Sequence, residues 1–165
     1  MLTSKKQKVF MGIDPGLATT GYGIIQEQGN NFRLVAGGII TTPAREEFGK
    51  RLATIHKQLN SIIKRYQPNS IAIEELFFAK NVTSALKVSQ ARGVAILAAR
   101  QNGYTIKEFT PLQIKQAITG YGRASKSQMQ KMTKLILHLK ITPRPDDLAD
   151  AIAIAICGAQ TKEFK

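Results

Sequence analysis

The sequence predicts an α/β fold built on a mixed five-stranded sheet, and two observations carry that prediction. Five short apolar runs have the length of strands, and the first three follow one another with no helical segment between them. The last two runs alternate with segments in which apolar residues recur at helical spacing. Three opening strands followed by alternating helix and strand are typical of a mixed sheet with helices packed on it.

The first half of the chain is expected to form three strands, one long helix and a fourth strand. Asp14-Pro15-Gly16 closes the first apolar run as a turn, so the first two runs pair as a hairpin. Apolar residues recur at helical spacing up to Tyr66, and Pro68 ends this helix. The expected ranges are strands at residues 9–13, 21–26 and 32–40, a helix at residues 46–66 and a strand at residues 70–74.

The second half is expected to contain four helices and one further strand. Gly103 suits the C-terminal cap of a helix, Thr110-Pro111 supplies an N-cap and a first-turn proline, and Ser125 caps the next helix. The expected ranges are helices at residues 82–102, 110–118, 125–139 and from about residue 146, with a strand at residues 104–109.

The last of these helices has an alternative, because alanine and isoleucine alternate over residues 151–156 as they would in a strand. A strand would point Asp147 and Asp150 to opposite faces, whereas a spacing of three on a helix places them on one face. We predict a helix because alanine favours it, aspartates stand at its start and Gly158 follows its end.

The chain's 165 residues and 18.1 kDa suit one domain, which we place at residues 9–160 between a basic, mobile extension at residues 1–8 and a short tail at residues 161–165. The 24 Lys and Arg against 11 Asp and Glu leave a net charge of +13, which favours a polyanionic partner such as nucleic acid. The sequence has no apolar run of about 20 residues and no apolar signal core, and its single cysteine, Cys157, cannot form an internal disulfide. We therefore expect a cytoplasmic protein.

Four of the few acids stand at the ends of predicted elements. Asp14 ends the first strand, Glu74 ends a buried strand, and Asp147 and Asp150 lie in the first turns of the last helix. Ligands collect beyond the carboxyl ends of strands in α/β sheets, so these four side chains are expected to converge. The alternative for Asp14 is a turn residue, and for Asp147, as for its neighbour Asp146, a helix-start charge that offsets the macrodipole. Glu74 is harder to explain structurally, since a carboxylate in a central strand costs several kcal/mol unless paired or metal-bound.

Converging carboxylates repel one another unless a cation lies among them. Mg²⁺ prefers such oxygen ligands and keeps positions open for phosphate, whereas His56 and His138 have no spacing that suggests zinc. We expect two Mg²⁺ ions about 4 Å apart, for which Mn²⁺ can substitute, in a phosphodiester cleavage.

Five sequence blocks, in order, resemble the RuvC family of Holliday junction resolvases over roughly residues 9–159. The blocks are Gly12-Ile13-Asp14-Pro15-Gly16 with Thr20-Gly21-Tyr22-Gly23, Ala72-Ile73-Glu74-Glu75 to Asn81, Ser84-Ala85-Leu86-Lys87 with Gln90-Ala91-Arg92-Gly93, the Gly120 to Gln128 segment, and Asp147-Leu148-Ala149-Asp150-Ala151. The resemblance implies a ribonuclease H-like fold with helices on both faces of the sheet. It also implies a homodimer that resolves four-way DNA junctions in recombination and repair by two symmetric nicks, with Asp14, Glu74, Asp147 and Asp150 as the catalytic metal ligands.

The same resemblance implies a set of DNA contacts, which comprises Phe77, Lys80, Lys115, Arg123 and Lys126. Core packing is the alternative for the phenylalanine, and a solvated face is the alternative for each cation in so basic a chain. We expect the helix at residues 82–102, with its small residues Ala91, Gly93, Ala95, Ala98 and Ala99, to form the dimer contact, with ordinary packing on the sheet as the alternative. The sequence leaves open whether branch-migration proteins bind the chain.

Three other functions share features with this sequence. A phosphotransferase of the actin and sugar-kinase type also has an Asp-x-Gly turn before a hairpin, but it needs a second glycine-rich Asp loop, which is absent, and a longer chain. A nuclease of the same fold that acts on an RNA/DNA hybrid stays open. A basic protein that recognises junctions without cutting them also stays open, and it differs from the nuclease in needing no metal.

Overall fold

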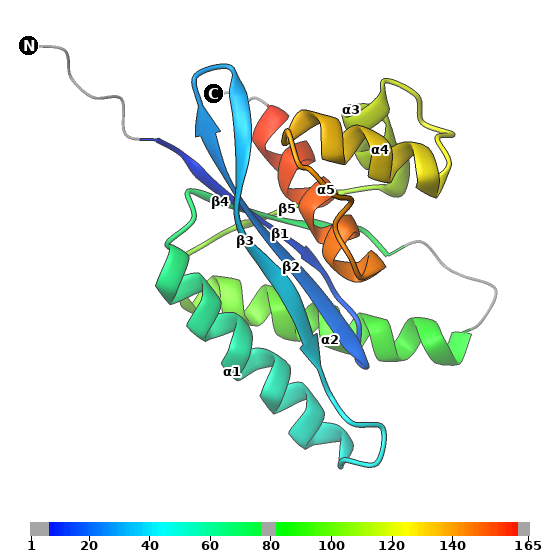
Figure 1. The fold of residues 1–165 in the computed structure, drawn as a ribbon. Coiled ribbons are helices and arrows are strands. Elements are labelled where there is room, and N and C mark those ends of the chain that lie inside the picture. The colour runs from blue at the N-terminus through cyan, green and yellow to red at the C-terminus, as the bar shows by residue number, and fades with distance from the viewer. Residues whose placement is uncertain (1–6, 77–81, 162–165) are drawn as a thin grey trace, which may run out of the picture.

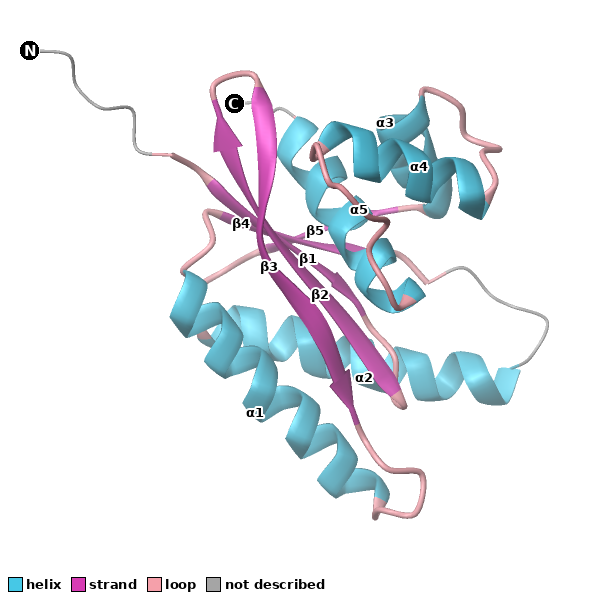
Figure 2. Ribbon diagram, viewed as in Figure 1, coloured by secondary structure: helices cyan, strands magenta, loops and turns pink. Residues whose placement is uncertain are grey.

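The five strands form one mixed sheet in the order β3-β2-β1-β4-β5 (Figures 1 and 2). The computed structural model describes residues 7–76 and 82–161. The two hairpins β1–β2 and β2–β3 are antiparallel, whereas β1 pairs with β4, and β4 with β5, in parallel. The strands are β1 (Val9–Asp14), β2 (Thr19–Gln28), β3 (Asn31–Thr41), β4 (Ser70–Glu74) and β5 (Ile106–Phe109). The mixed five-stranded sheet that the sequence predicts is therefore confirmed.

Helices cover both faces of this sheet, as Figure 1 shows. One face carries α1 (Phe48–Tyr66) and α2 (Val82–Gln101), and the other carries α3 (Pro111–Thr119), α4 (Lys126–Ile136) and α5 (Asp146–Gln160). Successive residues of a strand point to opposite faces, so Met11 and Ile13 belong to the core beneath α1 and α2, and Phe10 to the core beneath α5. Each face of the sheet thus has its own apolar core.

The helix α5 lies directly against β1 and β2 because glycines leave room for its backbone. A Cβ atom added at Gly12 would lie 2.1 Å from the carbonyl oxygen of Ala151, and one added at Gly21 would lie 2.0 Å from that of Asp147. No side chain fits such gaps, so these glycines set the depth at which α5 packs. The first turns of α5 are thereby held over the ends of the central strands.

The alternating residues 151–156 are helical, as predicted, and every residue from 151 to 158 is buried. α5 contacts the sheet on one side and the α3 and α4 layer on the other, so it is apolar nearly all round. A helix buried in this way does not need a periodic apolar stripe. This explains why its sequence also suited a strand.

The other predicted elements differ from the structure mainly at their ends. Thr110 and Ser125 cap α3 and α4 through reciprocal capping boxes, as their sequence positions indicate. The helix expected to reach residue 139 ends at Ile136, because the chain turns at His138 with a φ of 51°. α1 begins at Phe48 because the Glu47 carboxylate accepts bonds from the amides of Gly49 and Lys50. Among the described residues, no helix is both long and apolar enough to span a membrane.

Candidate active site

Two of the predicted acids lie side by side at one edge of the sheet. Asp14 is the last residue of β1 and Glu74 is the last residue of β4, and these parallel strands pair Ile13 with Ile73 just before the two acids. Both carboxylates therefore leave the sheet at the same edge, as expected for neighbouring parallel strands. Asp147 and Asp150 reach this edge from the opposite direction, in the first turns of α5.

The electrostatics of Asp14 show that the acids act on one another. Burial, together with the charges of Asp150, Glu74 and Asp147, raises the pKa of the Asp14 carboxyl to about 7, and the Lys126 ammonium only partly opposes this. All three other predicted acids thus lie close enough to disfavour a negative charge on Asp14. An uncompensated cluster of this kind is a characteristic of functional sites rather than of structural ones.

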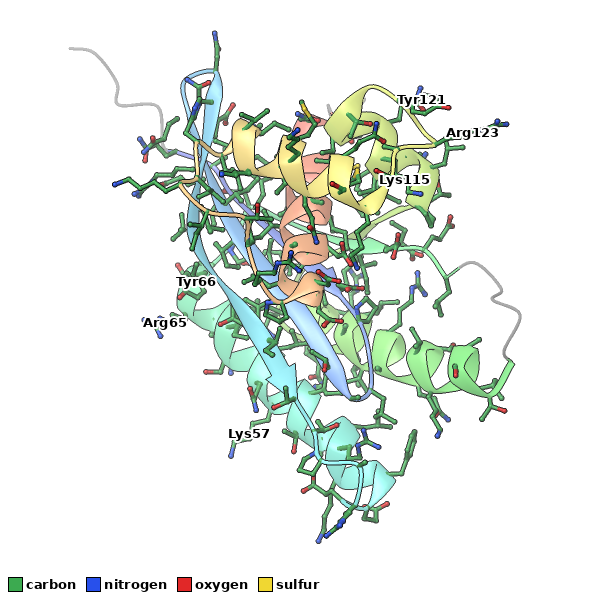
Figure 3. The ribbon with its side chains drawn as sticks, turned by 45° about the vertical axis from the view of Figure 1, so that its right-hand side comes forward. Lys57, Arg65, Tyr66, Lys115, Tyr121 and Arg123 are labelled. Carbon is green, nitrogen blue, oxygen red and sulfur yellow. The ribbon has the colours of Figure 1, made fainter. Side chains whose placement is uncertain are left out.

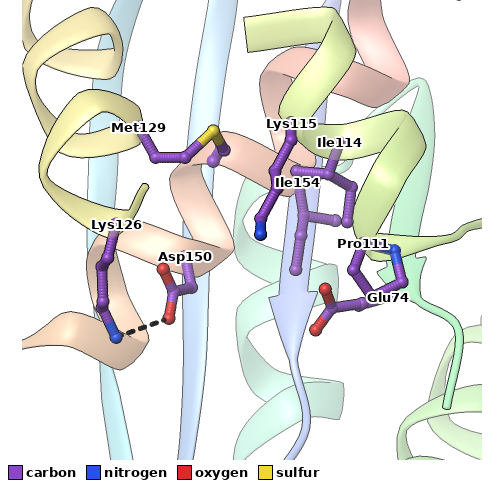
Figure 4. A pocket seen from close by; sticks show the side chains of 9 residues that line it. Glu74, Pro111, Ile114, Lys115, Lys126, Met129, Asp150 and Ile154 are labelled. Atoms are coloured by element: carbon purple, nitrogen blue, oxygen red, sulfur yellow. Dashed lines mark hydrogen bonds and ion pairs between the residues drawn. The ribbon is translucent and has the colours of Figure 1, made fainter. Parts of the chain in front are cut away.

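Asp150 and Glu74 line one hollow (Figure 4), and Glu74 ends β4, which lies on one side of β1 in the sheet. Burial first, then the charge of Asp150, raises the pKa of Glu74, while Lys115 opposes the shift. Burial also raises the pKa of Asp150, and Lys126 opposes that shift. Figure 4 shows the Lys115 side chain reaching down between the two carboxylates. We call this the Glu74 hollow; its walls also include Pro111, Ile114, Met129, Ala153 and Ile154.

Two ion pairs hold Lys126 at the Glu74 hollow. Its ammonium lies 3.1 Å from a carboxylate oxygen of Asp146 and 3.4 Å from one of Asp150. Asp146 is itself held by the amide of Gln130 at 2.9 Å and by the guanidinium of Arg144 at 3.4 Å. The hydrogen bond with Asp146 makes the largest contribution to raising the pKa of Lys126, and the pKa of Asp146 is lowered in return. Asp146, which sequence analysis left without a role, is therefore the anchor of a predicted DNA-contact lysine.

Asp147 lines a second hollow together with the cations Arg51 and Lys87 and the loop at residues 16–19, which leads from β1 to β2 on the other side of β1 from β4. We call this the Arg51 hollow. Within the described part of the chain, no three acids, histidines or cysteines lie close enough to hold one ion with their side chains as they stand. The predicted acids are thus neighbours that line two hollows, Glu74 and Asp150 in one and Asp147 in the other. Asp14 interacts electrostatically with the acids of both hollows.

The remaining predicted DNA contacts lie in different places. Lys115 and Lys126 line the Glu74 hollow, whereas the exposed Arg123 points away from it, beside Tyr121 (Figure 3). Phe77 and Lys80 fall outside the described residues. The sequence indicates no role for Arg51, which is one more cation in a chain of net charge +13, and it marks Lys87 only as part of the Ser84-Ala85-Leu86-Lys87 block.

His56 and Cys157 lie away from these hollows. The imidazole of His56 contacts Gln101 at 2.7 Å and belongs to a polar network between α1 and α2. Cys157 is buried within the α5 core, where burial raises the pKa of its thiol to about 11 and keeps it protonated. Apart from the Met129 thioether in the wall of the Glu74 hollow, the ligands that the two hollows offer a metal are carboxylate oxygens.

Comparison with known proteins assigns the chain to a family. A family model described as "Crossover junction endodeoxyribonuclease RuvC" matches residues 10–158. The chain belongs to the RuvC family. The RuvC protein of Alkaliphilus oremlandii is 53% identical over 156 residues, which cover 94% of this chain and 95% of that protein. The RuvC protein of Ruminiclostridium cellulolyticum is 51% identical over 149 residues, or 90% of each chain.

A solved RuvC structure shares the fold. The structure described as Thermus thermophilus RuvC in complex with Holliday junction substrate superposes with a TM-score of 0.88 at 37% identity and covers 92% of this chain and 93% of that one. The ribonuclease H-like architecture implied by the sequence blocks is thereby confirmed. The RuvC resemblance that those blocks carry is also confirmed.

Proposed function

We propose that this RuvC family member is a structure-selective endodeoxyribonuclease that resolves four-way DNA junctions by paired, symmetric nicks. Family membership over residues 10–158 supports the reaction class. The observation that carries the proposal to this chain's residues is the carboxylate cluster at the ends of β1 and β4, flanked by Lys115 and Lys126. Acids that repel phosphate, set among cations that attract it, are arranged for chemistry on a phosphodiester rather than for passive binding.

The donor set fits a divalent cation. Asp14, Glu74, Asp147 and Asp150 present only carboxylate oxygens, and burial together with the other three carboxylates raises the pKa of Asp14, which supports a cation among them. These four residues would hold the metal, and we assign two Mg²⁺ ions, with Mn²⁺ as a substitute. When bound, such ions lower the pKa of a water molecule and stabilise charge on the attacking and leaving oxygens.

The lysines of the Glu74 hollow bind and orient the DNA strand. Lys115 lines the same hollow as Glu74 and Asp150, where its positive charge favours the ionised Glu74 carboxylate. Lys126 is held by Asp146 at the rim of the same hollow. The positive charges of the two lysines offset the repulsion between the site acids and an incoming phosphate.

Paired nicks require two active sites in a fixed relation, and we propose a homodimer built on α2. The small residues that suggested this contact lie on two different sides of α2, four in the core and Gly93 on the exposed side. Ala91, Ala95, Ala98 and Ala99 are buried in the core beneath α1 and α2, so the expectation that they form the dimer contact is wrong. Leu86, Gly93 and Leu97 lie on the outer side of α2, where the two leucines are 60% and 51% exposed, and these form the contact we propose.

One assay tests the proposed function. The protein is incubated with a synthetic four-way junction, a linear duplex and an RNA/DNA hybrid, with and without Mg²⁺, and the nicks are mapped. We expect symmetric nicks in the junction only, and only with Mg²⁺. Cleavage of the hybrid in preference to the junction would establish a different ribonuclease H-like activity. Tight junction binding without nicks would establish a non-catalytic junction-binding protein.

A further inference from the structure

The Arg51 hollow lies beside the proposed catalytic acids but has no place in the reaction described so far. The loop at residues 16–19, between β1 and β2, forms one wall. The rest of the lining includes Arg51 of α1, Lys87 and Val88 of α2, and Asp147 of α5. Four segments distant in the sequence therefore meet here, and two of them contribute a cation.

We propose that the Arg51 hollow binds a backbone phosphate of the cleaved DNA strand, one that flanks the phosphate being cut. This inference rests on the proposed function. Lys115 and Lys126 would contact the strand on the Glu74 side of Asp14, and Arg51 and Lys87 would contact it on the other side. A strand held at both hollows crosses the acids between them, so the susceptible bond is fixed by contacts on either side of it.

Arg51 is held in place by a buried threonine. Its Nε donates a hydrogen bond to Thr42 Oγ1 at 2.9 Å, and the Thr42 hydroxyl donates to the carbonyl of Leu17 at 2.5 Å. The Thr42 amide also donates to the carbonyl of Ala18 at 3.0 Å. Thr42 is only 5% exposed, so one buried residue fixes both the arginine and the loop opposite it. The wall and the cation are thus preorganised, which lowers the entropic cost of binding an anion.

The two cations that line the Arg51 hollow favour an anionic ligand. Throughout residues 7–76 and 82–161, neither Arg51 nor Lys87 has an acid within ion-pair distance. Arg51 is partly buried and uses its donors only on Thr42, which leaves part of its guanidinium fork free. A planar fork with unused donors matches the oxygens of a phosphate better than any neutral ligand.

The loop wall is shaped for close approach by a ligand. Thr20 Oγ1 donates to the carbonyl of Gly16 at 2.7 Å and closes the loop on itself. A Cβ atom at Gly16 would lie 2.3 Å from the carbonyl oxygen of Thr19, so only glycine permits this turn. The loop therefore presents compact backbone to the hollow rather than long side chains, and a DNA strand can pass close to it.

Single uncharged phosphates test this contact directly. A series of four-way junctions is made, each with one methylphosphonate at a different position around the nick, and binding is measured in Mg²⁺ with a non-cutting Asp14→Asn protein. We expect one flanking position to cost about tenfold in affinity, the size of one charge-assisted contact. In Lys87→Gln the native junction should bind about tenfold more weakly, and the methylphosphonate at that position should cost nothing further.

Lys57→Gln is the matched control, because Lys57 lies on the outer side of α1, away from both hollows (Figure 3). It should bind like the parent and keep the full methylphosphonate effect. Arg51→Lys keeps the charge but loses the fork, so it should also weaken the response at the same position. Lys87 is exposed, and its substitution should leave the melting temperature unchanged.

Two results would overturn the inference. The first is that Lys87→Gln binds the native junction as tightly as the parent protein, and the second is that a methylphosphonate lowers the affinity of Lys87→Gln equally at every position tested. Failure of the wild-type protein to nick any junction would instead overturn the proposed function. The binding comparison decides the phosphate contact whichever way the nicking assay falls.

Discussion

The two helical layers of the molecule are packed by different means. α1 packs into its core through large side chains such as Ile55, Leu59 and Ile63, whereas α5 meets the sheet through glycines that bring its backbone against β1 and β2. Side-chain packing tolerates small shifts, because rotamers can readjust, but backbone contact does not. The layer that carries Asp147 and Asp150 is therefore positioned more tightly than the layer that supports it.

This difference assigns chemistry to one layer and support to the other. Glu74 and Asp14 leave the sheet where α5 begins, while α1 contributes Arg51 only at the margin. Substitutions that touch the α5 side should thus change nicking out of proportion to their effect on stability. Substitutions in the α1 and α2 core should lower stability with little effect on nicking while the protein stays folded.

The largest expected effect is the loss of cleavage when an acid at the end of a strand is replaced. Glu74→Gln should lower the nicking rate by about a thousandfold or more, because it removes a proposed metal ligand, while junction binding persists or tightens as repulsion of phosphate falls. Single-turnover cleavage and binding without Mg²⁺ measure the two quantities. Glu75→Gln is the matched control: Glu75 is the next residue and is exposed, and its variant should cut normally. Wild-type nicking by Glu74→Gln would reject the assigned site.

The next prediction compares the layers directly. Gly21→Ala should lower the free energy of unfolding by about 1–3 kcal/mol or more, because the added Cβ must displace the α5 backbone at Asp147. Leu59→Ala should cost about 2–5 kcal/mol by leaving a cavity in the other core. Denaturant unfolding gives both values. Measured well below the melting temperature, nicking should be impaired in Gly21→Ala and nearly normal in Leu59→Ala, and the reverse order would refute the contrast.

Gly93→Ala is the control for the glycine substitution, since nothing lies within 4 Å of a Cβ at that helical position. It should stabilise the protein by about 0.5–1 kcal/mol, because alanine loses less backbone entropy than glycine on folding. Its position on the outer side of α2 also makes it a probe of the proposed dimer contact. Gel filtration of this variant reports whether that surface tolerates an added methyl group.

The acids could be placed from the sequence because each one lies at the end of a strand or in the first turns of a helix, and the type of these elements could be predicted. Glu74 follows three buried strand residues, so its position at the sheet edge came with the strand. The Arg51 hollow could not be found in this way, since Arg51 meets the loop at residues 16–19 only through Thr42. That contact joins three segments through one buried hydroxyl, and no local pattern in the sequence encodes it.

The ends of elements show the same limit. Residues 137–139, Leu-His-Leu, continue the composition of the helix before them, yet His138 adopts a left-handed conformation and the helix stops at Ile136. The buried Leu137 completes the core beneath α5, so tertiary packing decides this boundary. Local propensity predicts where a helix starts, through caps such as Ser125, better than where this one stops.

A smaller effect should appear in the pH dependence of stability without metal. The pKa of Asp14 is raised to about 7 in the folded protein, from 3.8 for the unfolded carboxyl. The folded state then binds the proton more tightly, so stability is greatest below the unfolded pKa and falls as pH rises through the folded value. The melting temperature in EDTA should therefore drop between pH 5 and pH 8. Asp14→Asn should flatten this drop, and an unchanged profile in that variant would assign the effect elsewhere.

The smallest expected effect concerns Asp146, which stands in the well-packed layer but outside the set of proposed ligands. It holds Lys126 at 3.1 Å and is held in turn by Gln130 and Arg144, so Asp146→Asn should leave Lys126 with Asp150 as its remaining described acid partner. Pairing with Asp150 alone competes with metal at that carboxylate, so the variant should need several-fold more Mg²⁺ for half-maximal nicking while its maximal rate stays near normal. A Mg²⁺ titration of single-turnover nicking measures both. Asp146→Glu keeps the anchoring charge and should restore the wild-type requirement. A lower melting temperature and a lower maximal rate in Asp146→Asn, with an unchanged Mg²⁺ requirement, would show instead that Asp146 acts by stabilising the helix, as the macrodipole interpretation of its position holds.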